Sequence, residues 1–109
     1  MSQMISFADF EKVDLRVGKV IEAEKVGGTT KLIALKVNMG KETRQIVAGM
    51  AEYLDADYFI GKQVVVATNL APRTFKGRIS HGMILAADVR GKPYLITVDG
   101  EVPPGSKVR

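Results

Sequence analysis

Alternating apolar and polar residues are the main pattern along this chain, and they predict short strands. In residues 14–25 most residues at every second position are apolar, which predicts a strand, although Val20 breaks the alternation. Gly18 inside this segment indicates a bend or bulge that lets a small sheet curl. In residues 31–39 every second position from Ile33 is apolar, which predicts a second strand with one buried face.

Further strands follow at short spacing. A turn at Gly40 predicts that residues 42–48 pair back as a hairpin. Three more apolar runs predict strands over residues 63–68, 83–89 and 94–98. A turn is expected at residues 91–93, and residues 102–105 are expected to be extended and turn-like.

Residues 69–79, named here the basic arm, interrupt the strand pattern with Pro72, Gly77 and three cations. This composition predicts a loop or irregular segment.

Helical patterns are short. Ser6 with Asp9 three residues later resembles a capping box, so a helix is expected over residues 7–12. Residues 50–58 predict a short helix or turn. Five or six strands with so little helix predict a single all-β domain over residues 1–109, built as a small barrel. An SH3-like barrel and an OB-fold both fit, and periodicity does not distinguish them.

Composition excludes several classes of protein. The chain has no cysteine, so disulfides and thiolate metal sites are excluded. No apolar run approaches the roughly 20 residues that span a bilayer, and residues 1–11 lack the pattern of a secretory signal. We therefore expect a cytoplasmic protein that does not enter a membrane.

Catalytic chemistry is not indicated. Ser80 and His81 are adjacent, and neighbouring side chains on an extended chain point in opposite directions, so the two would not meet as nucleophile and base. A single histidine with scattered carboxylates has no metal-ligand spacing, and no glycine-rich phosphate-binding motif is present. We predict no catalytic residues, no metal site, no cofactor and no enzyme activity.

Positive charge is concentrated in one part of the sequence. The formal net charge is +4, but residues 61–92 hold six basic residues and one acidic residue, whereas the rest holds ten basic and eleven acidic residues. The basic arm adds Phe75 to its cations, which suits phosphate contacts and stacking on a base. The alternative is a solvated loop whose Phe75 plugs the barrel. Arg44 either reaches solvent on the ligand face of the sheet or pairs with Glu42 or Glu24.

Five short motifs, taken together, resemble a known family. They are residues 14–18 (DLRVG), 31–32 (KL), 44–49 (RQIVAG), 69–73 (NLAPR) and 77–87 (GRISHGMILAA). In order and spacing they resemble the tRNA-binding domain that is found free-standing, or fused to or partnered with methionyl-tRNA synthetase. Endothelial-monocyte-activating-polypeptide-like proteins and CsaA-type secretion chaperones belong to the same group. Two departures remove acidic residues, because Thr30 and His81 stand where the family often has Asp and Glu.

The resemblance implies an OB-fold five-stranded barrel with a short N-terminal helix and a C-terminal extension. It also implies tRNA binding through structure more than sequence, and a homodimer formed by elements outside the barrel. The candidate elements are the helix around Phe7 and Phe10 and the segment from Tyr94 onward.

Seven residues are predicted to bind tRNA. Cations on or near the arm are expected to contact phosphates, and two neutral residues to form hydrogen bonds. The cations are Lys31, Arg44, Arg73, Lys76 and Arg78, and the neutral residues are Asn69 and Ser80. Met83 is expected to pack in the mouth of the barrel.

The predicted function is tRNA binding, by a free-standing protein or by a non-catalytic beta subunit that assists a separate catalytic subunit of methionyl-tRNA synthetase. The alternative is a CsaA-type secretion chaperone, which needs an apolar groove for unfolded peptides. The concentration of cations in the basic arm favours RNA.

Overall fold

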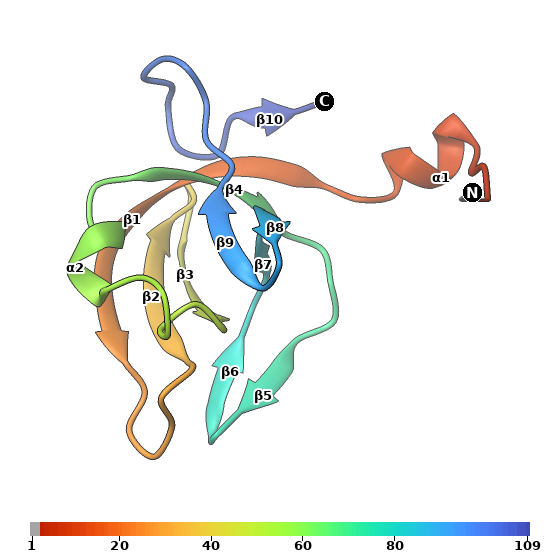
Figure 1. The fold of residues 1–109 in the computed structure, drawn as a ribbon. Helices are drawn as coiled ribbons and strands as arrows, with labels where there is room; N and C mark the ends of the chain where they lie inside the picture. Colours follow the sequence, from red (N-terminus) through yellow and green to blue (C-terminus); the bar gives the residue numbers. More distant parts are fainter. Residues whose placement is uncertain (1–2) are drawn as a thin grey trace.

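The structure is a computed structural model that describes residues 3–109, so the first two residues of the predicted domain lie outside the described residues (Figure 1). Strands are the main regular secondary structure, and helix is scarce. The elements are α1 (Phe7–Glu11), β1 (Leu15–Lys25), β2 (Ile33–Asn38), β3 (Thr43–Ala48), α2 (Ala56–Phe59), β4 (Gln63–Ala67), β5 (Arg73–Phe75), β6 (Arg78–Ser80), β7 (Met83–Ile84), β8 (Ala86–Val89), β9 (Lys92–Leu95) and β10 (Lys107–Val108).

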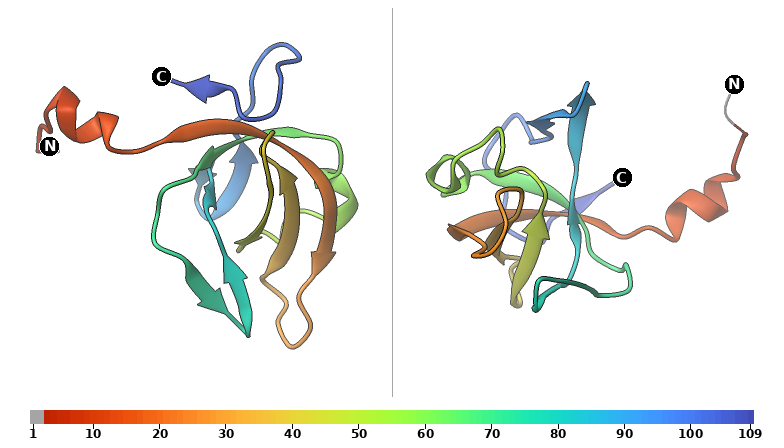
Figure 2. Two further views of the ribbon diagram at one scale, coloured as in Figure 1. Left: turned by 180° about the vertical axis from the view of Figure 1, so that it is seen from behind. Right: turned by 60° about the horizontal axis from the view of Figure 1, so that its bottom comes forward.

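The main sheet is antiparallel and has the strand order β3-β2-β1-β4-β7, with β10 paired to the start of β1. Strand β1 is 11 residues long and serves two neighbours. Its first part, Leu15 to Lys19, pairs with β4, and its second part, Lys19 to Lys25, pairs with β2. The sheet therefore curls around β1 (Figures 1 and 2), which confirms the predicted all-β, OB-like barrel.

Two features of β1 permit this curl. A Cβ on Gly18 would lie 2.5 Å from Val37 Cγ1, so the close approach of β2 requires a glycine there. The pairing register also shifts between Val20 and Glu22, which leaves Ile21 as the extra residue of a β-bulge. The bulge explains the broken alternation, because Val20 is 1% exposed and Ile21 is 42% exposed.

The core fills the inside of the curled sheet. The predicted apolar face of β2 is confirmed, because Ile33, Leu35 and Val37 are all buried. Phe59 on α2 is fully buried in the same cluster. Residues 50–58, predicted as a helix or turn, form a turn followed by α2, which begins only at Ala56.

The basic arm differs from its prediction, because it contains a β-hairpin of β5 and β6. The two residues of its turn, Lys76 and Gly77, have φ angles of 51° and 81°. Left-handed residues at both positions match the twist of a two-residue hairpin. Asn-Gly or Asp-Gly is the usual sequence signal for such a turn, and this chain has Lys-Gly there, so the turn could not be recognised from the sequence.

The C-terminal half also differs from its prediction, because it contains a second hairpin of the same kind. The predicted strand over residues 83–89 is split, because β7 pairs with β4 whereas β8 pairs with β9. Arg90 and Gly91 form the turn with φ angles of 53° and 89°, so β9 begins earlier than predicted. Strand β10 was not predicted, since two residues show no alternation.

The N-terminal helix α1 confirms the predicted position and cap. The Ser6 hydroxyl accepts a hydrogen bond from the Asp9 backbone N–H at 3.1 Å. The helix stands away from the barrel (Figures 1 and 2), and none of its residues is buried. Across residues 3–109, no helix combines the length and the apolar character needed to cross a membrane.

Candidate nucleic-acid interface

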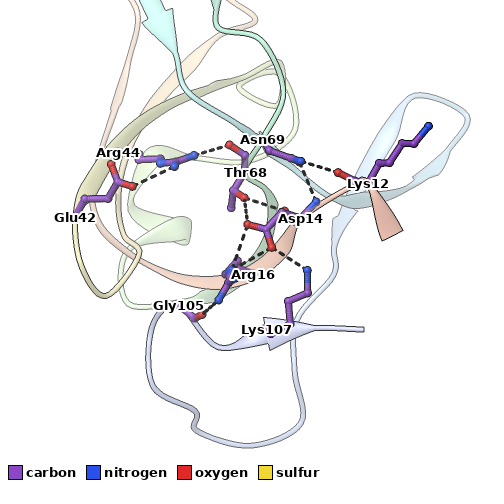
Figure 3. A network of polar contacts seen from close by, with 9 residues as sticks. All are labelled: Lys12, Asp14, Arg16, Glu42, Arg44, Thr68, Asn69, Gly105 and Lys107. Carbon is purple, nitrogen blue, oxygen red and sulfur yellow. Dashed lines mark hydrogen bonds and ion pairs between the residues drawn. The ribbon is translucent and has the colours of Figure 1, made fainter. Parts of the chain in front are cut away.

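The root of the basic arm is attached to the segment that links α1 to β1 (Figure 3). Asn69 uses both ends of its side-chain amide. Its Oδ1 accepts a hydrogen bond from the Asp14 backbone N–H at 2.8 Å, and its Nδ2 donates to the Lys12 carbonyl at 2.6 Å. Asn69 was predicted as an RNA contact, and in the structure its amide holds the arm root in place.

Asp14 lies at the centre of the same network. Its carboxylate contacts Lys107 Nζ at 2.8 Å, Thr68 Oγ1 at 2.7 Å and Arg16 Nε at 3.1 Å. The hydrogen bonds from Lys107 and Thr68, together with the nearby Arg16, outweigh partial desolvation and hold the pKa of Asp14 well below its usual range. Arg16 also donates to the Gly105 carbonyl at 3.1 Å. The C-terminal segment is thereby joined to the arm root.

Arg44 connects the two ends of the arm. Its guanidinium donates to the Thr68 carbonyl at 2.6 Å, just before the arm, and to the His81 carbonyl at 3.2 Å, just after it. Arg44 lies opposite Val37 in the β2–β3 pairing, on the side of the sheet that faces the core, and its side chain is only 24% exposed. The expectation that it reaches solvent on the ligand face is therefore wrong. The alternative, an ion pair with Glu42, is present at 3.1 Å.

Side chains also join strand β6 to β3. Ser80 is buried, and its hydroxyl accepts from the Val47 backbone N–H at 2.9 Å and donates to the Gly82 carbonyl at 3.0 Å. Gln45 donates to the Ile79 carbonyl at 2.9 Å. Because β3 and β6 share few backbone hydrogen bonds, these side chains complete the closure of the barrel. Sequence reasoning assigned Gln45 no role, and the only signal was its place beside Arg44.

Arg78 is held on the inner side of the hairpin. It forms an ion pair with Glu24 at 2.9 Å and a weaker contact with the Gln45 side-chain oxygen at 3.4 Å. Arg78 thus fastens β6 to the end of β1, and Glu24 offsets its charge.

The other three predicted cations are exposed. Within residues 3–109, Lys31, Arg73 and Lys76 form no ion pair. Lys31 lies in the loop between β1 and β2, and Lys76 lies in the turn between β5 and β6. Both segments project from the same end of the barrel (Figures 1 and 2). Arg73 lies over the Phe75 ring, with its Cζ 4.8 Å from the ring centroid.

This end of the molecule combines a rigid attachment with unneutralised positive charge. Residues 69–80 contain no acidic residue. Such a surface suits a polyanion, because the arm that carries Arg73 and Lys76 is held to the barrel and the cations need not be released from ion pairs. No group of three or more His, Cys, Asp or Glu side chains in the described part of the chain could hold a metal ion.

Comparison with known proteins identifies the family. The family model described as "Putative tRNA binding domain" matches residues 15–107. The chain belongs to this tRNA-binding domain family. It is 50% identical over 104 residues to a methionine–tRNA ligase of Thermotoga maritima, which covers 95% of this chain and 16% of the ligase. The chain thus spans about one sixth of that relative, and the matched region is the ligase's non-catalytic tRNA-binding domain.

Solved structures share the fold of this tRNA-binding domain over almost its full length. A MetRS-related protein from Pyrococcus horikoshii has a TM-score of 0.95 and 39% identity, with 99% of this chain and 100% of that chain covered. The chaperone CsaA from Bacillus anthracis has a TM-score of 0.90 and 28% identity, with 98% and 100% covered. The predicted resemblance to both groups is confirmed.

One prediction about the barrel mouth of this tRNA-binding domain is wrong. Met83 was expected to pack there, but it is 49% exposed. Strand β7 is the last strand of the main sheet, and its alternation buries Ile84 and turns Met83 outward beside the arm.

The Asp14 network predicts a pH-dependent contribution to stability. The folded pKa of Asp14 is depressed, so its contribution is complete above the unfolded pKa of about 4 and is lost as the pH falls below that value. Asp14→Asn should lower the free energy of unfolding by about 1–2 kcal/mol at pH 7, and the two proteins should converge toward pH 2.5. Urea unfolding across this range measures the difference.

Asp99→Asn is the matched control, because Asp99 is exposed and has no side-chain hydrogen bond or ion pair within residues 3–109. Its unfolding should follow the wild type at every pH. A difference between wild type and Asp14→Asn that stays constant down to pH 2.5 would contradict the role given to Asp14.

Proposed function

We propose that this chain binds folded tRNA at the end of the barrel where the basic arm and the β1–β2 loop, which contains Lys31, project together. The observation that carries the proposal is the acid-free arm, which is fastened to the barrel at both ends and leaves Arg73 and Lys76 exposed. OB-folds use the loops at this end for oligonucleotides. Shape and phosphate contacts suffice for a structured RNA, so we propose binding that is largely independent of sequence.

The seven predicted residues then divide into two roles. Lys31, Arg73 and Lys76 contact phosphates directly. The other four position the arm, and their contacts with the barrel support this role. They are Arg44, Asn69, Arg78 and Ser80.

The synthetase relatives support a role in protein synthesis. We propose that the chain acts in the cytoplasm, either free-standing or as a non-catalytic beta subunit that raises the affinity of a catalytic methionyl-tRNA synthetase subunit for tRNA. In either form it adds phosphate contacts and leaves the aminoacylation chemistry to the catalytic subunit.

We also propose a homodimer in which a second copy covers α1. Met4 and Ile5, just before α1, and Phe7 within it are 98%, 68% and 73% exposed, and α1 stands away from its own barrel. A helix of five residues has little stability alone, so its apolar side chains need a partner surface. A two-fold dimer would present two basic arms to one tRNA.

A CsaA-type chaperone is the second candidate function, and the likeness to the CsaA structure favours it. The exposed side chains of Leu70, within the arm, and Met83, beside it, would suit an apolar peptide. The cations at the same end favour RNA, because an unfolded peptide has no dense array of phosphates to match them.

The first test of the proposal is a salt series with bulk tRNA. The logarithm of the binding constant should fall linearly with the logarithm of salt concentration. Replacing Lys31, Arg73 and Lys76 together by Ala should weaken binding and reduce the salt slope by about one for each lost phosphate contact. Fluorescence anisotropy of labelled tRNA measures both quantities.

The matched control replaces Lys41, Lys92 and Arg109 by Ala, which removes the same charge away from the proposed surface. This variant should keep most of the affinity and slope. Equal losses in the two variants would contradict a defined surface. No tRNA binding by the folded wild type at low salt would contradict the proposed function and leave the peptide-binding chaperone.

The dimer is tested by sedimentation equilibrium. Wild type should have about twice the monomer mass of 11.9 kDa. Replacing Phe7 and Phe10 by Ser should give a folded monomer, because the apolar contact across the dimer is lost. Ile60→Ser, at another exposed apolar residue, should stay dimeric. A monomeric wild type, or a dimer that survives the double substitution, would contradict this arrangement.

A further inference from the structure

The basic arm and strand β3 line a cleft that has no role in the proposed phosphate contacts. Val47 of β3 forms its floor, and Leu70, Phe75 and Met83 contribute apolar walls. Its volume is about 80 Å³. The cleft therefore lies within the proposed RNA-binding end of the molecule and is mostly apolar.

The register of the arm hairpin explains why Phe75 faces this cleft. Phe75 pairs with Arg78, and Arg73 pairs with Ser80, so these four side chains share one face of the hairpin. Ser80 is buried against β3, which places that face toward the barrel. Phe75 is half-buried and does not belong to the core cluster. Its ring therefore lines the cleft and does not plug the barrel.

The rim of the cleft is apolar and accessible. Leu70, near the start of the arm, and Met83, just after its end, are 45% and 49% exposed and both line the cleft. Cations stand beside this rim, since Arg73 lies over the Phe75 ring and Lys76 follows it in the chain. No acidic residue lies in residues 69–80. The ligand that matches an aromatic and apolar surface flanked by cations is a flat ring attached to a phosphate.

We infer that this cleft receives one unpaired, unstacked base of the bound RNA, an inference that rests on the proposed tRNA binding. The base stacks on the Phe75 ring and contacts Leu70 and Met83, while Arg73 and Lys76 hold the adjoining phosphates. The cleft is too small to enclose a whole nucleotide, so one face or edge of the base enters and the sugar and phosphate stay outside.

The inference gives a physical basis for selecting folded tRNA over plain duplex. A duplex offers phosphates to the cations, but its bases are stacked on one another and cannot lie on Phe75. A folded RNA with exposed bases offers both contacts. The aromatic contact then adds affinity without adding to the salt dependence, because stacking releases no counterions.

The test substitutes Phe75→Leu, which keeps an apolar side chain of similar volume and removes the aromatic face. Affinity for tRNA should fall about 5- to 100-fold, with an unchanged salt slope. Affinity for an RNA duplex of similar length should change less than about twofold. Ile79→Ala, on the outer face of the same hairpin, is the matched control and should keep the wild-type affinity for tRNA.

Phe75→Trp supplies a second readout, because the natural chain has no tryptophan and the fluorescence then comes from position 75 alone. This variant should bind tRNA as the wild type does, and its fluorescence should be quenched by tRNA and by a short single-stranded RNA but not by the duplex. It also keeps the inference testable if Phe75→Leu disturbs the folding of the arm.

Several outcomes would overturn the base-binding cleft and leave tRNA binding intact. They are an unchanged affinity of Phe75→Leu for tRNA, an equal loss for tRNA and duplex, or tryptophan quenching by an unfolded peptide and not by RNA. Failure of the folded wild type to bind any RNA would instead overturn the proposed function, and the cleft with it.

Discussion

The attachment of the basic arm to the barrel is the constraint on which the rest of this structure depends. One guanidinium, that of Arg44, binds the carbonyls of Thr68 and His81, which flank the arm in the sequence. Asn69 and Ser80 add side-chain hydrogen bonds just inside these two points. A hairpin with two three-residue strands would not be stable alone. Held in this way, it becomes a fixed part of the barrel.

The same attachment divides the cations into two groups. Arg44 and Arg78 are committed to contacts with carbonyls and carboxylates that hold the arm. Lys31, Arg73 and Lys76 remain exposed at one end of the barrel, where no acidic residue of the arm offsets them. The arm backbone that carries Arg73 and Lys76 is already held in place, which lowers the entropic cost of binding a polyanion at this end. The chain therefore separates the residues that build the surface from those that are proposed to bind.

Much of the barrel could be predicted from the apolar pattern, because β2 alternates with one face in the core and β4 is an apolar run with both faces buried. The arm hairpin could not, since three-residue strands show no period and its turn has Lys-Gly. The contacts of Arg44 with the two ends of the arm depend on which face of β3 points to the core. Ile46 and Val47 are both apolar, so the sequence alone does not show which face of the strand points to the core, and with it whether Arg44 or Gln45 lies on that face. The sequence indicates Asn69 as a hydrogen-bonding residue, but it does not show its partners in the fold, which lie 55 and 57 residues away.

Contact between RNA and the arm end of the barrel can be mapped by NMR of the ¹⁵N-labelled protein during titration with tRNA. We expect backbone amide signals of residues 73–77 and Lys31 to shift or lose intensity first, while those of the β8–β9 hairpin stay unchanged at low tRNA ratios. Early changes confined to β8, β9 or the C-terminal segment, with the arm signals unaffected, would contradict it.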